Sequence, residues 1–376
     1  MPALHCALPA IGLLAAALLT SIAASGQMAT SDRLDGPGWW PTKGMPLRGD
    51  YIGAAACGAC HAAQFATQPA TSMARTAARA ESSDVLRART RLAFTLDAYI
   101  YEIVTTGQQS FYSVRDAARH SSVPLAWAFG AGKVGQSFLF QAGGAFREAR
   151  VSYYDSIHAL DFTPARAIAS PRTVDEAMGR PVADAELRRC FGCHTTASVV
   201  AGQFDPSQAV PGIACEGCHG PGRRHVEAMK QRRPEGGTRH ILNPASLEPA
   251  DSVDFCGACH STFWDVKLAG EKGSAAMRSQ PFRLLSSRCW NAGDARITCV
   301  ACHNPHAPLV RDLLAYDVRC RACHVARGAS LAREHPGRAC PVAEARCVTC
   351  HMPKYDLPEM HHEFTDHLIR IVRTHQ

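Results

Sequence analysis

Apolar and polar side chains alternate along one stretch of this chain and form short, broken runs elsewhere. Between residues 91 and 155, apolar residues such as Phe94 and Leu96 recur at every second position, which is the period of a strand with one buried face. Glycines interrupt this stretch, and further β-rich runs lie between them at 110–114, 137–141 and 151–154. The pattern predicts a small antiparallel β insertion over residues 91–155.

Outside this stretch the pattern favours short helices joined by irregular loops. Residues 62–79 are helix-forming but interrupted near Pro69, and residues 164–184 are polar and compatible with helix. A further helix is predicted to start after Gly222 and to carry Val226. Because 23 prolines and 29 glycines break longer elements, the predicted fold class is mainly α with irregular loops.

The first 50 residues have the composition of a leader. Residues 7–24 are apolar and the small residues up to Gly26 offer a cleavage site, so residues 1–26 are interpreted as a signal peptide. Residues 27–50 are rich in glycine, proline and tryptophan and are expected to be extended. We predict a periplasmic or otherwise exported protein. An uncleaved membrane anchor stays open, because no lysine or arginine precedes the apolar run.

Two cysteines three positions apart, followed directly by histidine, recur seven times. This is the attachment signature of c-type haem, because the two thiols can form thioethers with both vinyl groups of one porphyrin. The adjacent imidazole then binds the iron as its proximal ligand. Motifs 1 to 7, in chain order, are Cys57/Cys60/His61, Cys190/Cys193/His194, Cys215/Cys218/His219, Cys256/Cys259/His260, Cys299/Cys302/His303, Cys320/Cys323/His324 and Cys347/Cys350/His351.

Zinc knuckles and redox dithiols also use paired cysteines at this spacing. Neither chemistry needs a histidine directly after each pair, and all seven pairs have one. Seven motifs with two cysteines each account for 14 of the 17 cysteines. The set therefore predicts seven covalently attached haem c groups.

Seven haems leave too little protein for each to have a core of its own. Roughly 350 residues remain after the predicted signal peptide, which is about 50 residues per haem. We therefore expect the haems to pack against one another, with the chain wrapped around the stack. The predicted division places a first haem site at 51–90 and a six-haem domain at 156–376.

The formal net charge of +7 does not indicate a nucleic-acid partner. Seven haems would bring about fourteen propionates, so the oxidised protein would lie near neutrality. The sequence also shows no basic patch interleaved with aromatic residues, so no nucleic-acid binding is predicted.

A second axial ligand for each iron must come from outside the motifs. A histidine a few residues after a motif lies on the proximal side of its own haem, so it must serve another one. The predicted distal ligands are His225, His306, His335, His361 and His367, with His362 as an alternative to His361. Further candidates are His158, His240 and Met73. The alternative for the two histidines is a hydrogen bond to a propionate or the backbone, and the alternative for Met73 is a buried position in the core.

Cys289 and Cys340 are the two cysteines left between the leader and the end of the chain, outside all motifs. In an oxidising compartment an even pair suggests a disulfide, here one that closes a loop over the last three motifs. Two separate buried thiols are the alternative.

Several segments resemble the multihaem cytochrome c superfamily, which includes tetrahaem carriers, nitrite reductase and hydroxylamine oxidoreductase. They are CFGCHTT from Cys190, GIACEGCHGPGRRH ending at His225, CVACHNPH ending at His306, CVTCHMPK from Cys347 and HHEFTDHLIR ending at Arg370. The resemblance implies a heptahaem member whose His225 and His306 bind neighbouring haems. It also matches His361 and His367 to an HxxFTDH pattern. The sequence lacks the Cys-x-x-Cys-Lys motif of nitrite reductase, and no tyrosine can be matched to the cross-linking residue of hydroxylamine oxidoreductase.

The predicted function is to relay electrons between redox partner proteins, either cytochromes or quinol-linked membrane complexes. An alternative is an oxidoreductase that converts a small nitrogen or sulfur compound at a five-coordinate haem, where Arg223 and Arg224 could attract an anion. A haem-based sensor is disfavoured, because sensing one ligand does not require seven haems. Membrane association is predicted only if the N-terminal segment is uncleaved.

Overall fold

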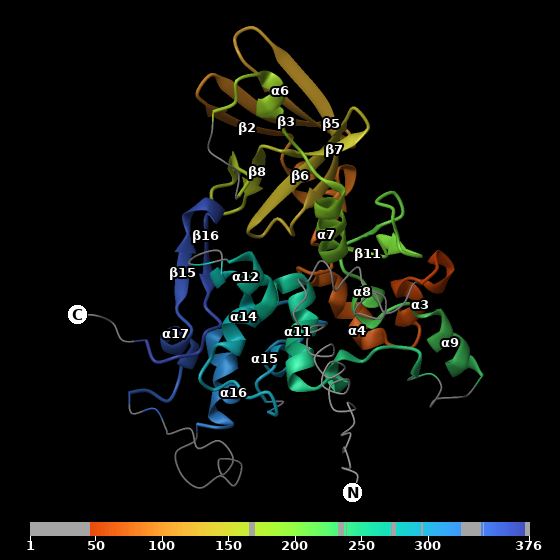
Figure 1. Cartoon of the computed structure of the whole chain (residues 1–376), viewed down its shortest axis with the longest axis vertical. Helices are drawn as coiled ribbons and strands as arrows, with labels where there is room; N and C mark the ends of the chain where they lie inside the picture. Colours follow the sequence, from red (N-terminus) through yellow and green to blue (C-terminus); the bar gives the residue numbers. More distant parts are fainter. Residues whose placement is uncertain are drawn as a thin grey trace, which may run out of the picture.

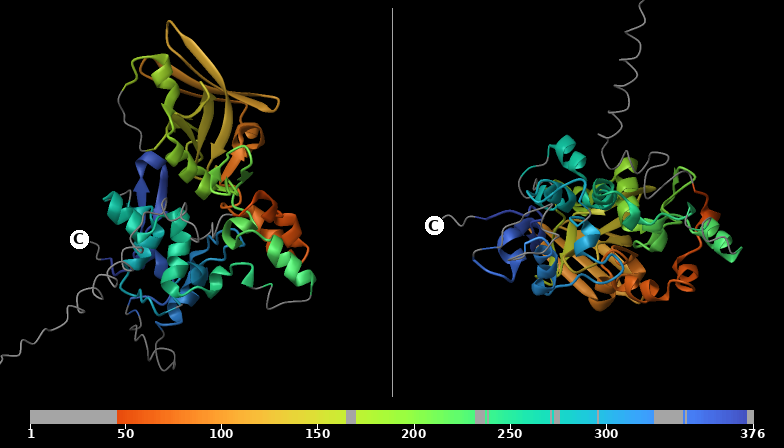
Figure 2. Two further views of the ribbon diagram at one scale, coloured as in Figure 1. Left: turned by 45° about the vertical axis from the view of Figure 1, so that its right-hand side comes forward. Right: turned by 90° about the horizontal axis from the view of Figure 1, so that it is seen from below.

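The computed structural model shows two parts stacked along the long axis of the molecule, a large sheet at one end and short helices at the other (Figures 1 and 2). The predicted signal peptide and most of the extended leader lie outside the described residues. The structure describes residues 46–372 except 165–169, 232–236, 238, 271, 273–275, 295, 325–339 and 341.

Ten antiparallel strands make up the sheet. Its main order is β10-β7-β6-β5-β4-β3-β2, β1 pairs with β5, and β8 pairs with both β6 and β9. The strands are β1 (Ala77–Arg79), β2 (Arg91–Leu96), β3 (Tyr99–Thr106), β4 (Gln109–Arg115), β5 (His120–Phe129), β6 (Gly135–Ala142), β7 (Ala145–Ala149), β8 (Val151–Tyr154), β9 (Ala159–Phe162) and β10 (Gly179–Pro181).

Tight hairpins connect the central strands. The chain reverses between β2 and β3 at Asp97, whose φ of 53° is left-handed, and between β3 and β4 at Gly107, with φ of 61°. The alternation around residue 97 therefore belongs to two strands of one hairpin. Leu96 pairs with Tyr99 and Phe94 with Tyr101, so the buried face passes from even-numbered positions in β2 to odd-numbered positions in β3.

Two apolar clusters form the core of this part. The larger lies within the sheet and includes the fully buried Tyr101, Ile103 and Tyr112. The smaller joins the sheet to helix α7 (Asp184–His194) through Trp127 and Phe191, whose ring centroids lie 4.9 Å apart. Burying an aromatic side chain of this size contributes roughly 1.5–3 kcal/mol, so α7 is firmly attached.

The prediction of a mainly α fold with a small β insertion is wrong. Helices make up 36% and strands 25% of the described residues. The sheet is larger than predicted because segments on both sides of the alternating stretch, β1 and β10, add to it through backbone pairing. The helices are short, and a short helix has little apolar stripe of its own to bury.

Motif 2 lies on α7 beside the sheet. The helical part carries the other six motifs. Its helices are α3 (Ala54–Gly58), α4 (Ala62–Thr67), α8 (Cys215–His219), α9 (Arg223–Lys230), α11 (Pro249–His260), α12 (Phe263–Ala269), α14 (Gln280–Leu285), α15 (Cys299–Cys302), α16 (Asp317–Arg321) and α17 (Cys347–His351).

Smaller elements complete the chain. The short helices α5 (Asp84–Ala88) and α6 (Val174–Met178) lie against the sheet, and the pairs β11 (Thr195–Thr196) with β14 (Val210–Pro211) and β12 (Val199–Val200) with β13 (Gln203–Phe204) follow α7. The hairpin β15 (Lys354–Leu357) and β16 (His362–Thr365) rises from the helical part towards the sheet (Figure 1). Across residues 46–372, outside the gaps given above, no helix is long and apolar enough to span a membrane.

Candidate haem-binding sites

The first cysteine of each motif lies on a helix, and this explains the spacing of the motif. Residues i, i+3 and i+4 of a helix lie on one face, so both thiols and the imidazole point to the same side. Where the helix is too short to reach the histidine, one helical hydrogen bond still forms: His61 N donates to Cys57 O over 2.9 Å, and His324 N donates to Cys320 O over 2.9 Å. The local backbone therefore presents two sulfurs and one imidazole together.

Three of the predicted distal ligands lie opposite motif histidines. A metal–imidazole nitrogen distance of about 2 Å places the ring centroids of two imidazoles on one iron roughly 6 Å apart. The three pairs are His61 and His225 at 6.4 Å, His219 and His306 at 5.9 Å, and His303 and His367 at 6.2 Å. Each pair joins residues that are distant in the chain, and each separation has room for an iron between the rings.

Backbone carbonyls orient several of these rings through Nδ1. Donation from Nδ1 leaves Nε2 for a metal and fixes the plane of the ring. The Nδ1 partners are Thr76 O for His194 (3.0 Å), Leu242 O for His219 (2.7 Å), Gly237 O for His225 (3.0 Å), Arg370 O for His351 (2.9 Å) and Thr365 O for His367 (3.1 Å).

Burial favours the neutral imidazole at several of these sites. It lowers the pKa of His194 and His260, and it lowers the pKa of His367 to about 4. Neutral imidazole is the form that binds a metal, so these side chains need not lose a proton before they bind.

The remaining distal candidates have other surroundings. His361 Nε2 lies 2.8 Å from Asp161 Oδ2, so this histidine joins the hairpin to the sheet. The adjacent His362 borders a pocket of about 280 Å³ between the hairpin and Ser156. His158 is exposed, 3.8 Å from Asp155. His240 is also exposed, Met73 is half-buried, and His335 lies outside the described residues.

Thiols of different motifs touch one another. Neighbouring thiols are those of Cys57 and Cys215, Cys193 and Cys259, Cys256 and Cys299, and Cys320 and Cys347. The helices agree with these contacts: α3 packs on α8, α11 on both α7 and α15, and α16 on α17. Motif 1 is therefore next to motif 3, and motif 4 is next to both motif 2 and motif 5.

The second cysteines of the last two motifs differ in their exposure to solvent. Cys323 of motif 6 is the one motif cysteine that is buried, with 4% of its surface exposed. Cys350 of motif 7 is exposed, and its Sγ lies 3.8 Å from the hydroxyl of Thr349. A vinyl group must reach the sulfur to form a thioether, so the predicted attachment at Cys323 requires that its thiol become accessible. The thiol of Cys350 is already accessible. Haem attachment at both cysteines stays a prediction.

The helical part fits a set of large apolar cofactors. Both apolar core clusters of the described residues lie in the sheet part and α7. Between motifs 5 and 6, by contrast, large apolar side chains face solvent, with Leu309 62% and Val318 64% exposed. Porphyrin rings attached to the neighbouring cysteines would cover such side chains. No disulfide joins any pair of the cysteines that the structure describes.

Cys289 is half-buried and Cys340 is exposed, and they are not bonded to each other. Three buried carboxylates, those of Glu216, Asp317 and Asp366, are not among the predicted site residues. Glu216 lies inside motif 3 and Asp366 directly precedes His367. The signal available in the sequence was an acidic residue next to a predicted ligand. Such a residue indicates a structural role if it is buried, because a charge is rarely buried without partners.

Three comparisons with known proteins each found a similar protein or family. Residues 148–220, which run from β7 to just past motif 3, match the family described as cytochrome c554 and c-prime. The multiheme cytochrome MtrA of Shewanella baltica (strain OS185) is 26% identical over 177 residues, which cover 44% of this chain and 45% of that protein. The match thus spans less than half the length of this curated relative.

The solved structure of the outer cell wall cytochrome OcwA has a similar fold. It aligns with a TM-score of 0.50 and 15% sequence identity, over 86% of this chain and 80% of that chain.

Proposed function

Because this chain is a multihaem cytochrome c, we propose that it is an exported heptahaem protein that relays single electrons between redox partners. The seven motifs would each hold one haem c, which supplies the one-electron chemistry when bound. The chain contributes the axial ligands, their orientation and the order in which the sites lie in space.

The three histidine pairs are the observation that carries this proposal. They support bis-histidine ligation at motif 1 by His61 and His225, at motif 3 by His219 and His306, and at motif 5 by His303 and His367. Two protein ligands fill both axial positions of an iron and leave no place for a substrate. Such sites favour electron transfer over catalysis.

The contacts between motifs support a continuous path. Electron tunnelling falls steeply with distance, so sites whose attachment cysteines touch are close enough to exchange electrons. Contacts between thiols connect motifs 1 and 3, motifs 4 and 5, and motifs 6 and 7, and Cys218 lies near Cys256 and Cys302 near Cys320. The proposed order is 1–3–4–5–6–7, with motif 2 as a branch beside motif 4.

The proposed partners are redox proteins, either cytochromes or quinol-linked membrane complexes. The outermost positions of the path are motif 1, motif 7 and the branch at motif 2. Each is a place where a partner could exchange electrons with the chain.

The test uses the whole chain, matured with haem in an exporting host. We expect a mass that corresponds to seven haems, and a ferric paramagnetic resonance spectrum with only low-spin signals that nitrite, hydroxylamine and sulfite leave unchanged. A protein without bound haem would contradict the proposal. A high-spin signal that shifts with one of these compounds would favour the oxidoreductase instead.

A further inference from the structure

Three carboxylates are buried in the helical part, and each lies in or beside a haem-binding segment and accepts hydrogen bonds from backbone amides. Their exposed fractions are 6% for Glu216, 7% for Asp317 and 0% for Asp366, and no other charged residue among those described is equally buried. A buried charge is costly unless it is paired and hydrogen-bonded, so these positions need a structural reason.

Glu216 joins motif 3 to motif 1 and to its distal ligand. Its Oε1 accepts hydrogen bonds from Ile52 N over 2.9 Å and from Gly222 N over 2.8 Å, and its Oε2 accepts one from Gly53 N over 2.9 Å. Gly53 precedes α3, which starts motif 1, and Gly222 precedes α9, which carries His225. One carboxylate therefore fixes both the proximal and the distal segment of the first site.

Asp317 joins motif 6 to motif 7 in the same way. It is the first residue of α16, which leads into motif 6, and it accepts hydrogen bonds from Arg346 N over 2.6 Å and Cys347 N over 2.9 Å. Cys347 is the first attachment cysteine of motif 7, so the start of that motif is held by the preceding one.

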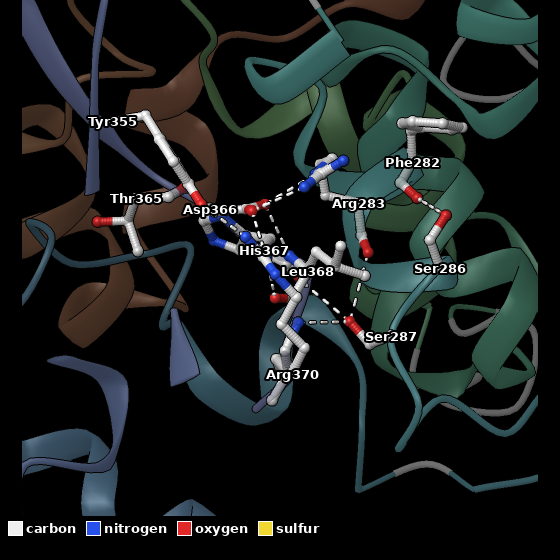
Figure 3. A network of polar contacts seen from close by, with 11 residues as sticks. Phe282, Arg283, Ser286, Ser287, Tyr355, Thr365, Asp366, His367, Leu368 and Arg370 are labelled. Carbon is white, nitrogen blue, oxygen red and sulfur yellow. Dashed lines mark hydrogen bonds and ion pairs between the residues drawn. The ribbon is translucent and has the colours of Figure 1, made fainter. Parts of the chain in front are cut away.

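Asp366 has the strongest set of partners (Figure 3). Arg283 donates to it from both Nε and Nη2, each over 2.7 Å, and Arg370 Nη1 donates to Oδ2 over 2.5 Å. The amide of Leu368 donates to Oδ1 over 2.9 Å. Two arginines thus neutralise the buried carboxylate and hold residues 366–370 against α14.

This segment serves two sites at once. His367 lies opposite His303 of motif 5, and its carbonyl accepts a hydrogen bond from Ser287 Oγ over 3.1 Å. Three residues later, the carbonyl of Arg370 accepts the Nδ1 hydrogen bond of His351 in motif 7, over 2.9 Å. Asp366 directly precedes His367 and accepts a hydrogen bond from the side chain of Arg370.

We propose that Asp366 is a positioning residue shared by two haem sites, through the distal ligand His367 of motif 5 and the carbonyl that orients His351 of motif 7. Glu216 has the equivalent position for motif 1. This inference rests on the proposed function, because it concerns haem ligands. Without the carboxylate, Arg283 and Arg370 lose their shared anchor, and both ligands change orientation together.

The test compares Asp366→Asn with Glu216→Gln as a matched control in the full, haem-loaded chain. Paramagnetic resonance signals are first assigned with His367→Ala for motif 5 and His225→Ala for motif 1. In Asp366→Asn we expect the motif 5 signal to shift or become high-spin in at least about half of the molecules, and added imidazole to restore a low-spin signal. The signal of the motif 7 haem should shift with it, and so should the midpoint potentials of the haems at motifs 5 and 7. Glu216→Gln should change the motif 1 signal and leave the motif 5 signal unchanged.

The two proposals fail differently. A wild-type protein without haem or low-spin signals would end the proposed function, whereas a normal wild type with an unchanged Asp366→Asn would overturn only this inference. If Asp366→Asn does not mature, Arg283→Lys replaces it, because lysine keeps the charge but loses the two-point contact. Arg283→Lys should shift the same two signals less strongly. In whichever of these two variants is measured, an unchanged motif 5 signal would contradict the inference. An equally large change of the motif 1 signal would contradict it too.

Discussion

At the scale of single residues, the partner of each imidazole nitrogen distinguishes a candidate ligand from a structural histidine. His219 donates Nδ1 to the Leu242 carbonyl and keeps Nε2 for a metal, with His306 on the other side. His361 instead uses Nε2 for Asp161. The sequence identifies His219 as a proximal ligand through its motif, but it predicts His361 as a distal ligand without showing that Nε2 is taken by Asp161.

Replacing His306 by methionine should raise the reduction potential of one haem. His/Met ligation gives a higher potential than His/His ligation, and we expect a change of more than about 0.1 V within the roughly 0.8 V that axial ligands span. An optical redox titration measures it. His158→Met is the control, because His158 is exposed and pairs with Asp155. A titration curve of His306→Met identical to that of the wild type would contradict the assignment.

Gly212 connects the first haem segment to motif 3 and cannot be replaced by alanine without strain. Its φ is +73°, and a Cβ there would collide with the Ala74 carbonyl. Gly107 has a similar φ of +61° but open space around it. We expect Gly107→Ala to cost about 1–2 kcal/mol and Gly212→Ala more than about 3 kcal/mol. Thermal unfolding of both variants measures the difference, and equal losses would show that no clash exists.

At the scale of elements, α7 is where the sheet and the motifs meet. It carries motif 2, and its Phe191 packs on Trp127 and Phe129 with centroid distances of 4.9 Å and 5.1 Å. Phe191 lies between Cys190 and Cys193, so the residue that anchors the helix in the sheet also sits within the motif. The position of motif 2 therefore depends directly on the sheet.

Phe191→Ala should destabilise the holoprotein by about 3–5 kcal/mol, because the cavity lies in the fully buried contact between helix and sheet. Phe111→Ala is the control on β4, where the ring is exposed, and should cost less than about 1 kcal/mol. Denaturant unfolding followed by tryptophan fluorescence reports on Trp127 among the five tryptophans of the chain. A small effect of Phe191→Ala would mean that α7 is held by other contacts.

At the scale of the whole molecule, the two parts have different sources of stability. The sheet part has its own apolar core, whereas the helical part has short helices, exposed apolar side chains and motifs in contact. For the helical part, the role of the haems as its core stays a prediction. The hairpin β15–β16, through His361 and Asp161, connects the two.

A haem-free chain should therefore fold only in part. When the protein is produced without haem attachment, we expect limited proteolysis to leave a fragment close to residues 77–191 and to digest the region after residue 213, because only the first retains a core. Mass spectrometry of the fragments identifies them, and the haem-loaded protein is the control. Equal resistance of both regions would show that the helical part is stable without its cofactors.

The sequence by itself determined the chemistry of attachment and most of the strands. Both follow from spacing within one element: Cys57, Cys60 and His61 share a helical face, and alternation around Ile103 and Tyr112 defines a strand face. It also identified His225, His306 and His367 as candidate distal ligands, although it predicted His361 as a distal ligand in the same way.

Only the tertiary structure decided which histidine lies opposite which motif, that motif 1 is next to motif 3, and that the sheet extends to β1 and β10. These features depend on contacts between residues 30 or more positions apart, as with Gly179 and Ala149 or His61 and His225. The spacing of a motif holds no information about such contacts, because they are fixed by the packing of elements and by buried groups such as Asp366.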